Sequence, residues 1–157
     1  FELWRPVRRP AGRNLAVRIE PPLQAFAAAS LANGFARPTT QPNAWAADFR
    51  DPAPCVTLRW SEPQQIGRIE LSFDADFDHP MESVLMGHPE GVMPFCVRSY
   101  RVEDDRGQLL HQRIDNYQTR NTIRLKPPVE TNALKIAVDP PNRDVPAALF
   151  EVRCYIE

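Results

Sequence analysis

The stretch "CVTLRWSEPQQIGRIELSF" at 55–73 decides the fold class of this chain, because apolar and polar residues alternate at both of its ends. In "VTLRW" the side chains of Val56, Leu58 and Trp60 point to one side of an extended backbone, and "IELSF" at 69–73 repeats the pattern. A period of two residues is typical of a strand that buries one face in a core. The stretch therefore predicts β-structure on both sides of the segment "SEPQQIG".

Similar β-rich runs recur between proline and glycine residues. The 17 prolines are scattered along the chain and disfavour long helices, since Pro lacks the backbone N–H and clashes with the preceding turn. We expect "SEPQQIG" and "KPPVETN" to be turns between antiparallel neighbours and "DDRG" at 104–107 to be a tight hairpin. The predicted strands cover 55–60, 66–73, 95–104, 108–114, 121–126, 132–138 and 149–156. This number and spacing predict an all-β fold, an antiparallel two-sheet β-sandwich of the jelly-roll kind.

Composition narrows the classes of partner. The net charge of −1 supplies no excess of Lys and Arg for nucleic acid or an anionic membrane, and no apolar run approaches the length of a membrane span. The three cysteines show no CxxC spacing, so buried thiols are expected. A bridge between Cys96 and Cys154 stays open, and with it the compartment.

One main domain is expected in the 157 residues, with a boundary near residue 22. Residues 1–22 are basic and interrupted by prolines, which predicts a linker or edge segment from a preceding domain, and residues 23–157 form the β-sandwich. The chain begins with Phe1. We therefore expect it to be a piece of a longer protein.

Four segments, taken in order, resemble a known family. They are "SLANGFARPTTQPNAWAAD" at 30–48, "CVTLRW", "IGRIELSFD" and "ALFEVRCY" at 148–155. Together they resemble the discoidin, or coagulation factor 5/8 type C, branch of the galactose-binding-like domains, over roughly residues 25–157. More narrowly, "DFDHPMESVLMGHPE", "MPFCVRSYRV", "NYQTRN" and "ALFEVRCY" look like the carboxy-terminal module of bacterial FAD-dependent oxidoreductases.

The two resemblances imply different functions. The narrower one implies a non-catalytic accessory module, with FAD held only by a preceding flavin domain of the same chain. This sequence has no GxGxxG of its own to hold a dinucleotide. The broader one implies a carbohydrate-binding module that uses loops at one end of the sandwich. We predict the accessory module, with the carbohydrate-binding module as the alternative and a metal-dependent hydrolase as a distant third.

The discoidin resemblance also implies a structural calcium site. The matching positions are Asn33 in "ANG" and Glu151 in "FEVR". Calcium prefers six to eight oxygen ligands with carboxylates among them, so Asn in place of Asp weakens the site. The alternative is a hydrogen-bonded loop in which Gly34 supplies a positive φ angle.

A long connection, about 76–93, is predicted between two strands. It is rich in Met, Leu and Val, so it is expected to pack against the rest of a larger protein, or else to form a wall of a ligand pocket. The aspartates from Asp74 onward lack the Gly and Glu that an EF-hand loop requires. A zinc site of His79, His88 and Glu82 is conceivable but has no informative spacing.

The residue types that recognise sugars are an aromatic ring and side chains with several hydrogen-bonding groups. Trp45 is either a stacking platform or a plug in the core, and Arg120 and Asn121 either bind a ligand or bind loop carbonyls. The predicted ligand-binding residues are Arg37, Trp45, His79, Glu82, His88, Arg120 and Asn121. No serine lies in GxSxG and no cysteine has a His nearby in sequence, so no catalytic residue is predicted.

Overall fold

The computed structural model describes residues 20, 25–37, 41–48, 50–74, 95–139, 141 and 145–156. Its elements are a short 3-10 helix η1 (Ala28–Ala32) and the strands β1 (Trp45–Ala46), β2 (Cys55–Phe73), β3 (Tyr100–Glu103), β4 (Leu109–Arg113), β5 (Arg120–Val138) and β6 (Ala148–Tyr155). All strand pairs are antiparallel, in the order β1-β6-β2-β5-β3-β4. The predicted all-β class is confirmed.

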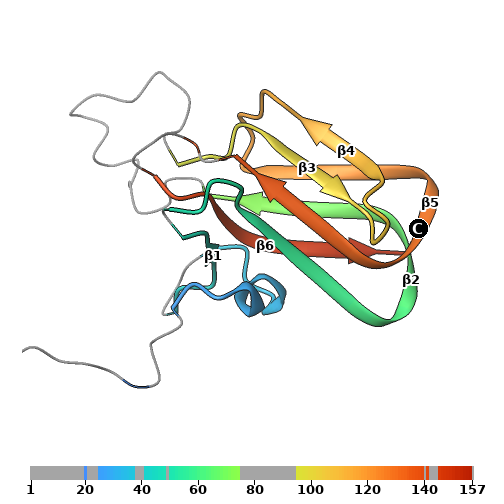
Figure 1. The fold of residues 1–157 in the computed structure, drawn as a ribbon, viewed down its shortest axis with the longest axis horizontal. Coiled ribbons are helices and arrows are strands. Elements are labelled where there is room, and N and C mark those ends of the chain that lie inside the picture. Colours follow the sequence, from blue (N-terminus) through green and yellow to red (C-terminus); the bar gives the residue numbers. More distant parts are fainter. Residues whose placement is uncertain are drawn as a thin grey trace, which may run out of the picture.

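The two long strands β2 and β5 turn this one sheet into two layers. Both curve round at one end of the molecule, so that the sheet folds over itself (Figure 1). The first part of β2 pairs with the last part of β5, as in Cys55↔Ala137, and the last part of β2 pairs with the first part of β5, as in Ser72↔Arg120. β3 and β4 extend the first layer, while β6 and β1 extend the second. The predicted sandwich is therefore built from continuous bent strands.

The predicted turns at "SEPQQIG" and "KPPVETN" are corrected by this arrangement. Residues 61–67 lie inside β2 and residues 126–132 lie inside β5, and the runs on either side of each segment pair with the other long strand. The register shifts between Arg59 and Gln64, which leaves Pro63 without a paired position. Proline is tolerated there because it has no N–H to donate to the ladder. The segments bend a strand instead of reversing it.

The predicted hairpin at "DDRG" is confirmed between β3 and β4. Gly107 has a φ of 77°, a conformation that favours glycine, and its N–H donates to the carbonyl of Asp104 at 3.2 Å. The Asp104 carboxylate accepts from the N–H groups of Arg106 and Gln108 at 2.9 and 2.7 Å. These bonds give the backbone N–H groups of the turn their acceptors and hold the outer strand β4 against β3.

The core lies between the two layers. The alternating apolar side chains of β2 meet those of β3, β5 and β6 there, and burying each of the large ones contributes roughly 1.5–3 kcal/mol. Phe73 and Tyr100 link the two layers, with ring centroids 5.2 Å apart. The fully buried members include Leu31, Ile66, Ile69, Leu71, Phe73, Val97, Val102, Leu134, Ile136 and Leu149.

The three thiols are free: Cys96 is buried, Cys154 is half-buried and Cys55 is exposed. Burial raises the pKa of both Cys96 and Cys154 to about 11, so these two thiols are protonated at neutral pH. The Cys96–Cys154 bridge that the sequence left open is absent. The expectation of buried thiols does not hold for Cys55, because it occupies an outward position at the start of β2.

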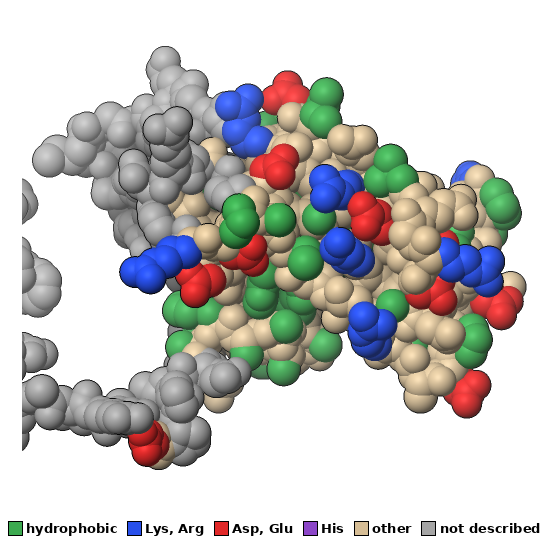
Figure 2. Space-filling model, in the orientation of Figure 1, with side chains coloured by type: hydrophobic (Ala, Val, Ile, Leu, Met, Phe, Trp, Pro, Cys, Tyr) green, Lys and Arg blue, Asp and Glu red, His purple; other side chains and the backbone are tan. Residues whose placement is uncertain are grey.

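Charged side chains of both signs are interspersed on the face that Figure 2 shows. In the part of the chain that the structure describes, no helix is both long enough and apolar enough to cross a membrane. The predicted linker 1–22 and the predicted connection 76–93 fall outside the described residues, except for Glu20.

Candidate functional site

A hollow of about 350 Å³ lies where β2 ends and β5 begins. Phe73 is the last residue of β2, Arg120 is the first residue of β5, and the loop after η1 contributes Arg37. Its volume falls within the range of about 300–1,000 Å³ that is usual for ligand pockets. It is lined by Ala36, Arg37, Ser72, Phe73, Thr119, Arg120 and Phe150.

A second, smaller hollow lies near the bends. It has a volume of about 140 Å³, and its lining includes Trp60 and Tyr155. One face of the Tyr155 ring is covered by the guanidinium of Arg68, 4.0 Å from the ring centroid. This hollow is below the usual size for a ligand pocket. The larger hollow is therefore the candidate site.

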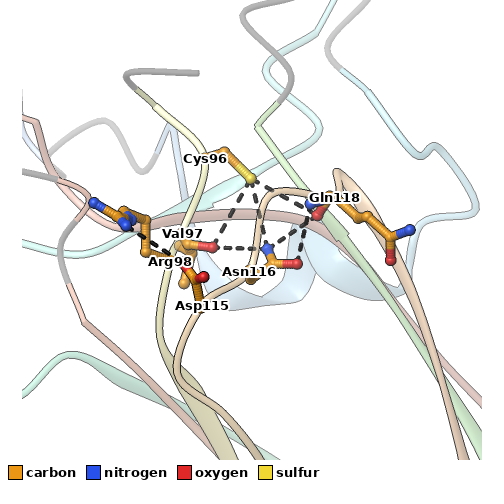
Figure 3. A network of polar contacts seen from close by, with 6 residues as sticks. All are labelled: Cys96, Val97, Arg98, Asp115, Asn116 and Gln118. Atoms are coloured by element: carbon orange, nitrogen blue, oxygen red, sulfur yellow. Dashed lines mark hydrogen bonds and ion pairs between the residues drawn. The ribbon is translucent and has the colours of Figure 1, made fainter. Parts of the chain in front are cut away.

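A buried asparagine fixes the loop that leads into the site. Asn116 is only 1% exposed, and its side-chain amide donates to the carbonyls of Val97 and Gln118 at 2.8 and 3.0 Å (Figure 3). Its Oδ1 accepts from the Gln118 N–H and from the Asn121 side chain, both at 3.1 Å. The carbonyl of Thr119, the residue after Gln118, accepts from the N–H of Phe73 at 2.7 Å. The wall formed by Thr119 and Arg120 is therefore preorganised.

An ion pair holds Arg120 in place. Its Nη2 donates to Oε2 of Glu70 at 2.8 Å, and the other Glu70 oxygen lies 3.3 Å from Nη1 of Arg68. Glu70 is buried on the outer side of the second layer, whereas the Arg120 side chain is 68% exposed. The carboxylate thus anchors one edge of the guanidinium and leaves the rest of it accessible.

The electrostatics of Glu70 follow from these arginines. The pKa of the Glu70 carboxyl lies below its ordinary value of 4.5, chiefly because Arg120 hydrogen-bonds to the charged form. The charges of Arg68 and Arg153 lower this pKa further, while burial opposes the shift. The folded protein therefore favours the ionised carboxylate.

This shift predicts how stability depends on pH. The pKa of Glu70 is lower in the folded than in the unfolded chain. The ionised carboxylate therefore stabilises the fold above about pH 4.5, and this stabilisation is lost as the pH falls through the folded-state pKa. In urea unfolding between pH 7 and pH 3, Glu70→Gln should lose less stability on acidification than the wild type. The exposed charge-matched control Glu62→Gln should follow the wild type. Parallel curves for Glu70→Gln and the wild type would contradict this prediction.

The hollow brings together two of the residues predicted to bind a ligand, Arg37 and Arg120. Trp45 is only 9% exposed and belongs to the core, which supports the alternative that it fills the core, and its role in ligand binding stays a prediction. Asn121 is buried and donates to the loop carbonyl of Gln118 at 2.9 Å, as the alternative of binding loop carbonyls requires, and its role in ligand binding stays a prediction. Its Oδ1 accepts from the Tyr100 hydroxyl at 3.2 Å. The predicted ligand-binding residues His79, Glu82 and His88 lie outside the described residues.

The predicted calcium pair has other hydrogen-bond partners. Oδ1 of Asn33 accepts from the N–H of Phe35 at 2.9 Å, and its Nδ2 donates to Asn43 at 2.8 Å. Oε1 of Glu151 pairs with Arg153 at 2.8 Å. These oxygens do not form a calcium-type donor set as they stand. Among the described residues there is also no group of three or more His, Cys, Asp or Glu side chains placed to hold a metal ion. Calcium binding here stays a prediction.

Residue patterns alone carry little indication of the other wall residues. Ser72 is the polar member of an alternating strand, and Thr119 stands next to a predicted residue, but neither spacing nor residue type marked them out. Glu70 was missed because its partner Arg120 is 50 positions away. The outward register of β2, Ser72↔Arg120 and Glu70↔Thr122, is what brings these polar groups together.

Comparison with known proteins bears on the fold. No protein-family model and no curated protein matches the sequence. Among solved structures, the family 32 carbohydrate-binding module from Streptococcus pneumoniae EndoD has a TM-score of 0.64 at 13% identity, covering 88% of this chain and 91% of the other. The family 32 module from C. perfringens NanJ, in complex with galactose, has 0.58 at 13%, covering 84% and 86%. Chitosan-binding module 1 from the chitosanase/glucanase of Paenibacillus sp. IK-5 has 0.57 at 13%, covering 84% and 86%. At such low identity they establish a shared fold, which confirms the predicted β-sandwich.

Proposed function

We propose that this chain is a non-catalytic carbohydrate-binding module that holds its ligand in the hollow lined by Arg37 and Arg120. The observation that carries the proposal is the hollow itself, in which guanidinium and hydroxyl groups converge at one end of the sandwich. Sugars present many hydroxyl groups, and converging donors and acceptors suit them. The fold shared with modules described as carbohydrate-binding supports the same conclusion.

Binding without catalysis fits the groups in the hollow. Among the described residues, the seven that line the hollow include no Asp, Glu, His or Cys. Hydrolysis of a glycosidic bond ordinarily needs a pair of carboxyl groups as acid and base or nucleophile. The groups that line the hollow are suited to hold a ligand and lack the means to transfer its protons.

A steric block tests the site whatever the charge of the ligand. Ala36 is exposed at the edge of the hollow, so Ala36→Trp should fill the space and abolish the ligand-induced rise of the unfolding midpoint. At a free ligand concentration of about 100 times Kd, the wild type should gain about 2.7 kcal/mol. The measurement is thermal unfolding with a panel of neutral, acidic and amino sugars. Ala29→Trp, exposed on η1 and away from the lining, is the matched control.

The outcomes separate clearly. A sugar that stabilises the wild type and the control but not Ala36→Trp supports the proposal. No stabilisation by any sugar, or equal stabilisation of all three proteins, would reject the hollow as a carbohydrate site.

The second candidate is the accessory packing module of an FAD-dependent oxidoreductase, with a preceding flavin domain as its partner. One observation favours it: Ile114 is 74% exposed and Tyr117 is 64% exposed, on the loop that Asn116 fixes. Large apolar side chains held outward on a fixed backbone suit docking to another protein surface. If no sugar in the panel raises the unfolding midpoint, this candidate is favoured over the first.

A further inference from the structure

We infer that the hollow selects an anionic glycan, one whose carboxylate or sulfate group is bound between Arg37 and Arg120. This inference rests on the proposed carbohydrate binding and names the class of sugar. It is carried by the charges around the hollow, by the fixed position of one arginine, and by the lack of an exposed aromatic face among the lining residues.

The charges favour an anion. Two of the seven described lining residues are arginines from different parts of the chain, and none of the seven is acidic. Arg37 is exposed and pairs with no carboxylate among the described residues. Glu70 is the carboxylate nearest to Arg120, but Arg68 shares it. Arg153 also acts on Glu70 and pairs with Glu151, so two carboxylates face three guanidinium groups there, and Arg37 adds further positive charge.

The guanidinium of Arg120 is preorganised for binding an anion. A guanidinium has five N–H donors in a planar fork that matches carboxylate and sulfate oxygens. The bond to Glu70 uses one edge of the fork, and the side chain remains largely exposed. Because Glu70 is buried and Asn116 fixes the preceding loop, little freedom is lost when an anion binds.

The described part of the hollow lacks an exposed aromatic ring, the feature that neutral sugars most often use. Its two aromatic side chains, Phe73 and Phe150, are only 1% and 3% exposed, so they form a floor and offer no ring face for stacking. Affinity must then come mainly from hydrogen bonds and charge. A cationic polymer such as chitosan would be repelled by the two guanidinium groups, although the fold is shared with a chitosan-binding module.

The experiment is calorimetric titration of the wild type with a matched pair, methyl galactoside and methyl galacturonoside, and with galactose 6-sulfate. The acidic sugars should bind at least about tenfold more tightly than the neutral one, as expected for charge-assisted hydrogen bonds. Their affinity should fall between about 20 and 200 mM NaCl, while the neutral affinity should not, because salt screens exposed charges. Comparing the affinities of methyl galacturonoside and galactose 6-sulfate shows which anionic group the hollow prefers.

Two variants separate charge from hydrogen-bond geometry. Arg37→Gln, at an exposed position, should weaken binding of the acidic sugars about tenfold and binding of the neutral sugar by much less. Arg120→Lys keeps the charge but loses the planar fork, so it too should weaken the acidic sugars. Arg106→Gln, which removes the same charge from the exposed β3–β4 hairpin, should bind like the wild type. Circular dichroism of each variant checks its fold.

Each remaining outcome overturns a definite statement. Equal affinity for galactoside and galacturonoside would overturn the anionic selectivity and leave the carbohydrate proposal standing. Inorganic sulfate that binds as tightly as galactose 6-sulfate would show a free-anion site and also overturn the inference. If no sugar binds, the carbohydrate proposal fails and the inference fails with it.

Discussion

Phe73→Ala is expected to lower the free energy of unfolding by about 3–5 kcal/mol, the range for removing a large aromatic side chain from a core. Phe73 is buried at the end of β2, and its ring packs against Tyr100 of β3 in the other layer. The substitution therefore leaves a cavity between the two layers at the floor of the hollow. Urea or guanidinium unfolding monitored by fluorescence measures the loss as a shift of the midpoint at unchanged slope.

A surface phenylalanine is the matched control for this change. Phe26 is exposed, so Phe26→Ala should change the unfolding free energy by no more than about 0.5 kcal/mol. Similar small losses for both variants would mean that Phe73 does not bridge the layers. Because Phe73 also lines the hollow, its alanine variant should lose ligand binding at temperatures where it is still folded.

Asn116→Ala should be nearly as costly, at about 2–4 kcal/mol, although it removes no large apolar surface. The substitution leaves the carbonyl of Val97 without its 2.8 Å donor, and it removes the acceptor of the Gln118 N–H and of the Asn121 amide. A buried polar group without a partner costs about 1–3 kcal/mol, and more than one group is affected here. The measurement is again the midpoint and slope of denaturant unfolding.

The neighbouring residue provides the control for Asn116. Asp115 is exposed and, among the described residues, pairs only with the exposed Arg98 at 3.3 Å, so Asp115→Ala should cost about 0–1 kcal/mol. A cost for Asn116→Ala as small as that of Asp115→Ala would show that water replaces the lost bonds. We also expect the Asn116 variant to bind ligand more weakly, because the loop that carries Thr119 and Arg120 would no longer be fixed.

Several features of the fold could be predicted from residue patterns because their causes are local. The alternation in β2 required strands with one buried face, and "DDRG" combined a turn-forming aspartate with a glycine at a positive φ angle. The connections at residues 61–67 and 126–132 could not be predicted in the same way. Proline and polar residues fit a turn and a strand bend equally well, and which one forms depends on the partner strand.

The candidate site shows the same division. The sequence by itself determined the β class, and it singled out Arg37 and Arg120 as predicted ligand-binding residues. Only the tertiary structure decided that Trp45 and Asn121 are buried, and that Glu70 and Arg120 meet across β2 and β5. The physical reason is that side-chain alternation is set by the backbone of a single strand, whereas burial and register depend on which distant strand completes the ladder and the core.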